Sequence, residues 1–173
     1  MKPLRLAAIA VGLIMASFAA LLAAAPAQAR ETVAFHGYPV GSIVVRTGER
    51  RLYFVAGPGI AWRYPVGVGR AGKAWTGEAR VEGKYVEPAW APPDEIRREQ
   101  PHLPELIPGG DRDNPMGAAA LTLRGGEYAI HGTNVPGSVG GFVSYGCIRM
   151  YNQDITDLYQ RVGVGTPVVV TAR

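Results

Sequence analysis

The amino-acid sequence predicts a mostly β domain with one or two short helices, and three observations support this prediction. Apolar and β-branched runs of roughly four to eight residues alternate with short glycine-containing turns, as in β-hairpins. Seven prolines between residues 88 and 117 interrupt any long element there. After them, apolar residues recur at helical spacing in one stretch, at 153–162. Residues 30–173 are enough for one hydrophobic core, so we expect a single domain.

The first part of this domain is predicted to be all β. Apolar runs at 40–45 and 52–56 flank a short turn at 46–50, and this pattern predicts a hairpin. Glycines and a proline at 57–59 then break the chain. Residues 61–68 alternate well enough to predict a third strand.

The middle of the chain is the least regular part. Residues 79–82 alternate as another short strand, and a short helix is predicted at 94–99, between two prolines before it and one after it. A segment as long as 88–117 with little regular structure is often a functional wall or lid, although a surface loop that wraps the sheet fits the sequence equally well.

The last part combines strands with a helix. Two apolar runs between 118 and 130 predict a second hairpin, which places His131 at the end of a strand. Asn152 is a suitable N-cap for a helix at 153–162, whose apolar residues lie on one face. A final apolar strand is predicted at 167–171.

Residues 1–29 have the pattern of a secretory signal peptide. Lys2 and Arg5 precede an apolar run, and Ala27-Gln28-Ala29 is a small-residue cleavage pattern, so we expect cleavage before Arg30. The alternative is an uncleaved N-terminal membrane anchor, because the apolar run approaches the length of a span. With cleavage, the protein has no stable membrane span and is exported, to the periplasm or the cell wall.

Charge and cysteine content exclude several classes of function. Without residues 1–29 the formal net charge falls from +4 to +2, and the basic residues do not cluster, so no nucleic-acid partner is expected. Cys147 is the only cysteine, and the histidines at 36, 102 and 131 lack the spacing of zinc ligands. We therefore expect no metal and no organic cofactor.

Cys147 is the candidate nucleophile. A single cysteine in an exported protein cannot form an internal disulfide, and a thiol of ordinary pKa needs a nearby base to become an effective nucleophile. His131 is the best-placed base, since the intervening loop is long enough to return to the end of its strand. The amides of Gly146 and Cys147 are candidate oxyanion donors. The alternative is a buried structural cysteine in a glycine-rich loop.

Three further side chains near the cysteine are candidates for roles in the site. Arg149 is suited to pair with a substrate carboxylate, or equally with a carboxylate of the fold itself. Ser144 and Thr133 are suited to hold the loop through hydroxyl hydrogen bonds, or to cap local turns.

These residues resemble the catalytic signature of the L,D-transpeptidases, the YkuD-type domain of bacterial cell-wall enzymes. The resemblance extends over nearly all of residues 30–173. The matching segments are His131-Gly132-Thr133-Asn134, Ser144-Tyr145-Gly146-Cys147-Ile148-Arg149-Met150, Asn152, Asp154, Leu158, Tyr159, Ile43-Val44-Val45, Leu52-Tyr53, Lys73-Ala74-Trp75-Thr76-Gly77 and Asn114-Pro115-Met116-Gly117.

The resemblance implies a β-sandwich-type fold with a short helix after the cysteine, and it implies roles for several of the matching residues. It implies that Cys147 is acylated and that His131 is the general base, oriented by the backbone carbonyl of Gly132. Arg149 matches a position that shapes the site and holds substrate. Six further residues are assigned, four to oxyanion stabilisation and site shape (Gly146, Gly132, Ser144, Tyr145) and two to substrate binding (Thr133, Asn134).

The sequence departs from the family pattern at two positions. Tyr145 stands where many relatives have His or Lys, and Trp75 stands where many have Pro. Because Trp75 and Trp90 occur in the same proline-rich region, we expect residues 70–117 to form an aromatic wall beside the cleft.

The function implied is L,D-transpeptidation of peptidoglycan. The enzyme would release D-Ala from a tetrapeptide stem and transfer the acyl group to an amine of another stem or of an acceptor lipoprotein. The alternatives are an L,D-carboxypeptidase that uses water as acceptor and a catalytically silent cell-wall-binding module. A papain-like wall endopeptidase is disfavoured, because those families place the cysteine before the histidine.

Overall fold

The computed structural model describes residues 30–125 and 128–173, so the predicted signal peptide at 1–29 lies outside the described residues. No helix in the described ranges is long and apolar enough to cross a membrane. The strands are β1 Glu31–Ala34, β2 Ile43–Arg46, β3 Arg51–Gly57, β4 Ile60–Pro65, β5 Val68–Gly69, β6 Gly77–Val86, β7 Ala119–Leu123, β8 Ala129–His131, β9 Phe142–Ser144, β10 Ile148–Arg149 and β11 Pro167–Thr171. The helices are α1 Asp94–Glu99, α2 Asn152–Arg161 and a 3-10 turn, η1, at Pro136–Ser138.

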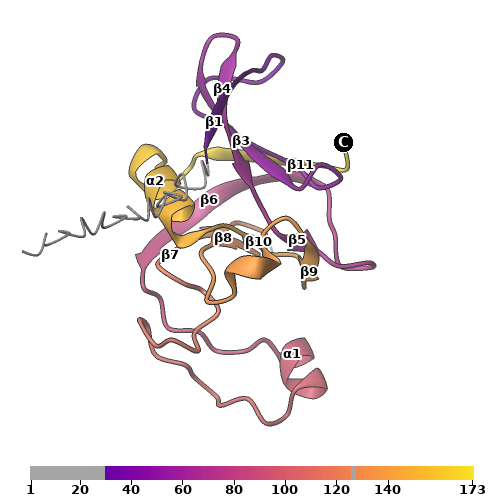
Figure 1. Ribbon diagram of the computed structural model, residues 1–173, viewed down its shortest axis with the longest axis vertical. Coiled ribbons are helices and arrows are strands. Elements are labelled where there is room, and N and C mark those ends of the chain that lie inside the picture. Colours follow the sequence, from indigo (N-terminus) through magenta and orange to yellow (C-terminus); the bar gives the residue numbers. More distant parts are fainter. Residues whose placement is uncertain (1–29, 126–127) are drawn as a thin grey trace, which may run out of the picture.

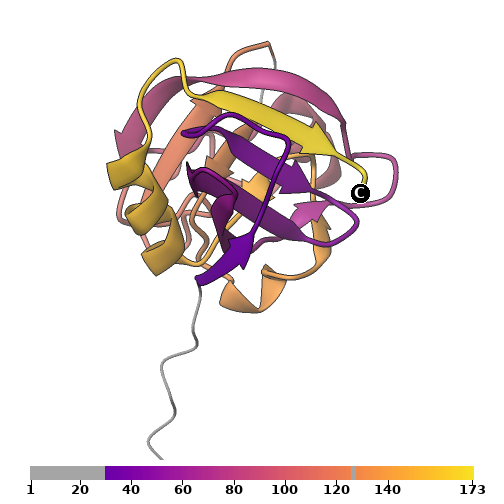
Figure 2. The same ribbon diagram turned by 90° about the horizontal axis from the view of Figure 1, so that it is seen from above.

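Nine of these strands form one sheet that bends at β6. The strand order is β1-β4-β3-β2-β11-β6-β7-β8-β10, and β5 pairs separately with β9. The first part of β6 pairs with β11 and the rest pairs with β7, with a bulge between Val81 and Gly83. Figures 1 and 2 show the two halves of the sheet turned toward each other, with α2 against one open side. This arrangement confirms the predicted mostly β, sandwich-type fold.

The main hydrophobic core lies between the two halves. It takes Ile43 and Leu52 from the first half, Leu121 and Ile130 from the second, and Leu158 from α2, all almost fully buried. A smaller cluster around Phe35, Val44 and Tyr53 covers the opposite face of the first hairpin. Both faces of β2 and β3 are therefore buried, which explains why their sequences are nearly continuously apolar.

The predicted first hairpin is confirmed, but the predicted strand at 61–68 is divided. β2 pairs antiparallel with β3, and β3 pairs with β4. β4 ends at Pro65, which cannot donate a ladder hydrogen bond. The chain then turns to Gly67, which forms an isolated bridge with Arg149, and to β5, which pairs with β9. A Cβ at Gly67 would lie 2.6 Å from the Ser138 carbonyl oxygen, so this close approach requires glycine.

The later predicted elements are confirmed with changed boundaries. β7 and β8 form the second hairpin, α1 occupies 94–99, and β11 is the final strand. The predicted strand at 79–82 is extended to ten residues in β6. The extension could not be predicted from alternation of apolar and polar residues, because a bulge between Val81 and Gly83 shifts the pairing register and interrupts that alternation.

The prediction that Asn152 caps α2 is wrong. Tyr151 is the N-cap residue, and it makes no side-chain capping bond. The Asn152 side chain instead accepts hydrogen bonds from the backbone N–H groups of Ala118 and Thr133, at 3.1 and 3.0 Å. At the other end of α2, Lys84 Nζ donates to the carbonyls of Tyr159 and Val162, at 2.7 and 2.6 Å.

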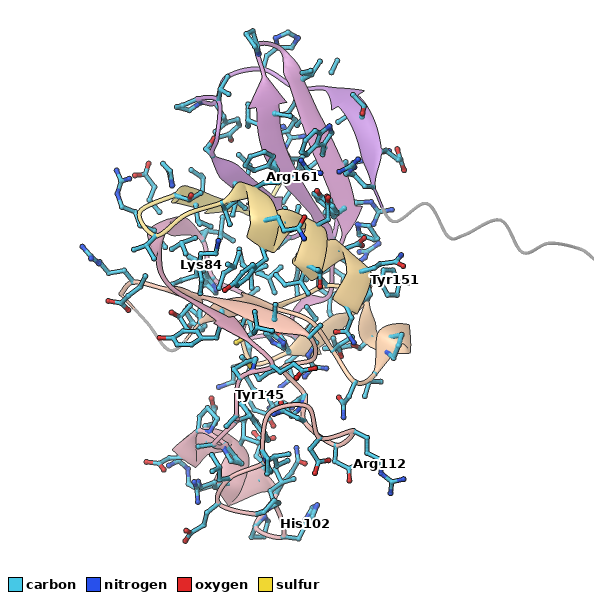
Figure 3. The ribbon with its side chains drawn as sticks, turned by 90° about the vertical axis from the view of Figure 1, so that its left-hand side faces the viewer. Lys84, His102, Arg112, Tyr145, Tyr151 and Arg161 are labelled. Atoms are coloured by element: carbon cyan, nitrogen blue, oxygen red, sulfur yellow. The ribbon has the colours of Figure 1, made fainter. Side chains whose placement is uncertain are left out.

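Residues 88–117 form a lobe that extends from one end of the sheet and carries α1 (Figure 1). The backbone N–H of Glu87 donates to the Ala118 carbonyl at 3.0 Å and closes the base of this lobe. Inside it, Trp90 and Ile107 form an isolated bridge, and the Asn114 amide donates to carbonyls including that of Pro88. In Figure 3 the lobe lies at the bottom of the molecule and includes His102 and Arg112.

Candidate active site

Parallel pairing of β8 with β10 brings the candidate base and nucleophile together. Ile148 pairs with Ile130, and Arg149 pairs with His131. Because side chains alternate along a strand, the two isoleucines point into the core while His131 and Arg149 share the opposite face. Cys147 directly precedes β10 and opens to the same side. The Met150 amide donates to the His131 carbonyl at 2.8 Å and extends this pairing.

A cavity of about 890 Å³ opens onto this face, between the sheet and the lobe. Five of the sequence-predicted residues line it: Cys147, His131, Ser144, Tyr145 and Arg149. From the lobe, Trp90, Ile96 and Met116 contribute to its walls. Of the three histidines only His131 lines this cavity, and the other two are exposed.

The His131 imidazole is buried and favours its neutral form. Burial lowers the pKa of His131 to about 4, and the positive charge of Arg149 acts in the same direction. Backbone hydrogen bonds with Gly132, Pro115 and Met116 oppose that shift, although no partner with good geometry for Nδ1 is found among the described residues. At neutral pH the imidazole is therefore unprotonated and can accept a proton.

The pKa of the Cys147 thiol is subject to opposing effects. Burial raises the pKa of the Cys147 thiol, whereas a backbone hydrogen bond with Ala129 and the positive charge of Arg149 lower it. A neutral thiol beside a neutral imidazole is thus the favoured resting state. This state suits transfer of the thiol proton to His131 as the sulfur attacks.

Arg149 brings a positive charge into the cavity. Burial lowers the pKa of Arg149, and the nearby Cys147 opposes that shift. Its buried Nε has no hydrogen-bond partner, and the guanidinium forms no salt bridge within 30–125 and 128–173. Of the two alternatives from the sequence, a salt bridge within the fold is not observed among the described residues.

Ser144 fixes the turn that carries the cysteine. Its hydroxyl donates to the Cys147 carbonyl at 2.6 Å and accepts the Gly146 N–H at 3.1 Å. Both bonds lie within the turn, so they fit a loop-holding and a turn-capping role of Ser144 alike. In this state the N–H of Gly146, a candidate oxyanion donor, is donated to Ser144.

Trp75 supports the same turn from behind, which sequence reasoning did not predict. Its indole Nε1 donates to the Gly146 carbonyl at 3.0 Å, and its ring stacks on Tyr128 with centroids 5.0 Å apart. Gly146 has φ of 123°, and a Cβ there would lie 2.3 Å from the Tyr128 ring. The turn therefore requires glycine beside this aromatic pair.

The wall of the cavity only partly matches the prediction. Trp90 and Tyr85 line the cavity, as expected for an aromatic wall built by residues 70–117. Trp75 is not a lining residue, because it lies behind the cysteine turn.

Thr133 and Asn134 do not line the cavity. Thr133 is buried, and its hydroxyl accepts the Val135 N–H at 3.0 Å, which makes it a turn-capping residue. The Asn134 amide donates to the Arg112 carbonyl at 3.2 Å. The geometry thus gives no support to their predicted role in substrate binding.

Gly132 lies in a tight junction formed by Asn152. A Cβ at Gly132 would lie 2.2 Å from Asn152 Oδ1, and so would one at Gly117. Asn152 therefore joins the start of α2 to the strand that ends in His131, a role that the sequence pattern did not indicate. Among the described residues, no group of three or more His, Cys, Asp or Glu side chains is placed to hold a metal ion.

Comparison with known protein sequences finds similarity to L,D-transpeptidases. The family model for the L,D-transpeptidase catalytic domain, YkuD, matches residues 41–170. A Salmonella typhimurium protein, "Probable L,D-transpeptidase ErfK/SrfK", is 42% identical over 140 residues, which cover 76% of this chain and 44% of that protein. A Fuscovulum blasticum protein, named as an L,D-transpeptidase in the ATP synthase subunits region, is 32% identical, and the match covers 96% of both chains. The chain thus spans less than half the length of the Salmonella relative.

A solved structure supports the fold. The L,D-transpeptidase of Enterococcus faecium, in a cysteine-to-serine mutant, aligns with a TM-score of 0.61 at 16% identity. The alignment covers 77% of this chain and 50% of that one. At this identity the likeness concerns the arrangement of the strands.

Proposed function

This chain belongs to the L,D-transpeptidase (YkuD) family, and we propose that it is a cysteine acyltransferase acting on the tetrapeptide stems of peptidoglycan. The observation that carries the proposal is the placement of Cys147 and His131 on one face of the β8–β10 pair, at the wall of a single cavity.

In the acylation step, the Cys147 sulfur attacks the carbonyl between the diamino acid at position three and the D-Ala at position four. His131 accepts the thiol proton as the carbon–sulfur bond forms. The same proton then passes to the departing nitrogen as the peptide bond breaks, so D-Ala leaves as a free amine and the stem remains as a thioester. The neutral His131 imidazole is available to accept the thiol proton, and its lowered pKa favours passing that proton on to the departing nitrogen.

In the transfer step, an acceptor amine attacks the thioester and His131 accepts a proton from it. The carbon–sulfur bond breaks, the proton returns to the sulfur, and an amide is formed. A stem peptide as acceptor gives a 3-3 cross-link, and the lysine of an acceptor lipoprotein gives a protein bound to the wall. Water as acceptor gives L,D-carboxypeptidase activity.

Arg149 and the backbone around Cys147 supply the electrostatic part of the proposal. The Arg149 guanidinium lies on the same face as His131 and has no carboxylate partner among the described residues, so it is suited to hold a carboxylate of the stem. The oxyanion that forms on the attacked carbonyl requires N–H donors. If Gly146 is one of them, the Ser144 hydroxyl must rotate away from it first.

We place the protein outside the inner membrane, in the periplasm or the cell wall. This proposal rests on the signal-peptide pattern of residues 1–29 and on the position of peptidoglycan itself.

Release of D-Ala from purified tetrapeptide tests the proposal. We expect Cys147→Ala to abolish the release and His131→Gln to reduce it by about 10²–10⁴-fold, the usual contribution of a general base. His102→Gln replaces an exposed histidine far from the cavity and is the matched control, with unchanged release expected. Undiminished release by Cys147→Ala would overturn the assignment.

Mass spectrometry after incubation with a carbapenem separates the enzyme from a silent wall-binding module. A covalent adduct on Cys147 is expected for the enzyme. A folded protein that stays unmodified would favour the silent module.

A further inference from the structure

The lobe at 88–117 is closed upon itself at its base. The Glu87–Ala118 hydrogen bond joins its two ends, and Trp90 and Ile107 exchange backbone hydrogen bonds of 2.9 and 2.8 Å inside it. Glu87, which directly precedes the lobe, and Gly117, its last residue, both have positive φ, at 43° and 64°. The lobe is therefore an internally bonded unit joined to the sheet at one narrow base.

At its far end, the lobe contacts the rest of the protein through polar side chains. α1 buries none of its six residues. The Glu99 carboxylate accepts two hydrogen bonds from the Arg70 guanidinium, at 2.8 and 3.0 Å, and one from the Tyr145 hydroxyl. Glu95 pairs with Lys73 beside them.

These contacts end on the turn that carries the nucleophile. Tyr145 is two residues before Cys147, and Figure 3 shows it where the lobe meets the body of the protein. The Arg70 guanidinium lies 4.1 Å from the centre of the Tyr145 ring, and the Arg70 backbone N–H donates to the Ser144 carbonyl at 2.9 Å. Arg70 and Tyr145 thus contact each other beside the cysteine turn, and Glu99 is the residue of the lobe that bonds to both.

We propose that Arg70, Glu99 and Tyr145 form a latch that holds the lobe over the cavity and controls access to Cys147. Tyr145 is then a positioning residue, which acts on the nucleophile through Glu99 and the lobe. The lobe contributes Trp90, Ile96 and Met116 to the cavity wall opposite the catalytic pair, so its position decides how open the cavity is. This inference depends on where Cys147 lies and not on its acyl-transfer chemistry.

The ion pair in the latch contributes little binding energy. The Arg70 and Glu99 side chains are 39% and 45% exposed, and ion pairs with this exposure contribute little and are screened by salt. We therefore expect the lobe to open and close readily. Opening of the lobe would widen the entry to the cavity for a stem peptide that is attached to the cell-wall polymer.

The rate of Cys147 alkylation by iodoacetamide tests the latch directly. We expect the rate for the unaltered protein to rise about two- to fivefold from low to high salt, the effect of losing one or two exposed charge pairs. Glu99→Gln and Arg70→Gln should each show the higher rate already at low salt, with little further response. Tyr145→Phe removes one bond to Glu99 but keeps the Arg70–Glu99 pair, so its rate at low salt should be raised less and should still rise with salt. Glu105→Gln, which changes an exposed carboxylate of the same lobe, is the control and should behave as the unaltered protein.

The two charge variants separate a latch from a direct electrostatic effect on the thiol. Removing Glu99 makes the surroundings of Cys147 more positive, and removing Arg70 makes them more negative, yet both release the lobe. Faster alkylation in both variants supports the latch. Rates that shift in opposite directions, or that do not change in any variant, would overturn it, and urea unfolding of each variant checks that it is folded. Because D-Ala release is not measured here, this result is independent of the proposed activity.

Discussion

Asp154 and His131 are expected to act against each other in the pH dependence of stability. Burial and the neighbouring Asp157 raise the pKa of Asp154 from 3.8 to about 6, and one oxygen of its buried carboxyl has no hydrogen-bond partner among the described residues. Burial lowers the pKa of His131 from 6.5 to about 4. Each group therefore binds protons differently in the folded and unfolded states, across nearly the same pH range.

The two contributions have opposite signs. The folded protein binds a proton at Asp154 more tightly than the unfolded chain does, so this group adds stability as the pH falls from about 6 to 4. The unfolded chain binds a proton at His131 more tightly, so stability is lost as the pH falls through 6.5 toward 4. Between pH values of about 7.5 and 4.5, linkage gives a gain of about 2 kcal/mol from Asp154 and a loss of about 2.5 kcal/mol from His131.

Asp154→Asn removes only the first contribution. We expect the free energy of unfolding of the unaltered protein to change by less than about 1 kcal/mol from these two groups over that range. The variant should instead lose about 2.5 kcal/mol on acidification and should be the more stable protein at neutral pH. Urea unfolding, followed through the fluorescence of the three tryptophans, measures both curves. Parallel curves for the two proteins would refute the reasoning, because Asp154 would then titrate alike in the folded and unfolded states.

Two further substitutions separate support of the site from stability of the fold. Trp75→Phe keeps the stacking on Tyr128 but removes the hydrogen bond to the cysteine turn, so the carbapenem acylation rate of Cys147 should fall about tenfold, as for about 1.4 kcal/mol. A rate equal to that of the unaltered protein would show that the bond does not position the thiol. Lys84→Met removes two charge-assisted bonds to carbonyls at the end of α2 and should lower the free energy of unfolding by about 1.5–3 kcal/mol. Its acylation rate should stay unchanged, and a loss of acylation without a loss of stability would contradict this assignment.

Local sequence patterns predict the secondary-structure elements whose pairing partners are adjacent in the sequence. The β2–β3 and β7–β8 hairpins follow from apolar runs around short turns, and both are present. Placement of His131 at a strand end follows in the same way. The pairing of Cys147 with His131 as candidate nucleophile and base is predicted from their residue types and their order in the chain.

Contacts between distant residues could not be predicted in this way. β9 and β10 are two or three residues long in a glycine-rich stretch, and their partners lie far away along the chain. Asn152 satisfies the local rule for a helix cap. In the folded chain, however, its side-chain oxygen accepts hydrogen bonds from the backbone N–H groups of Ala118 and Thr133, which are distant in the sequence. The indole of Trp75 meets a carbonyl 71 residues later, and no periodicity encodes such a pair.

The parallel pairings also affect the order of folding. β2 pairs with β11, so residues 43–46 meet 168–171, and β8 pairs with β10 across the loop that begins at Gly132. Closing such long loops costs chain entropy before any contact offsets it, so these pairings are expected late. Until β10 joins β8, the chain holds its only thiol apart from its only buried histidine. Assistance of the thiol by a neighbouring imidazole therefore requires the completed fold, and a partly folded chain exposes Cys147 only as an ordinary thiol.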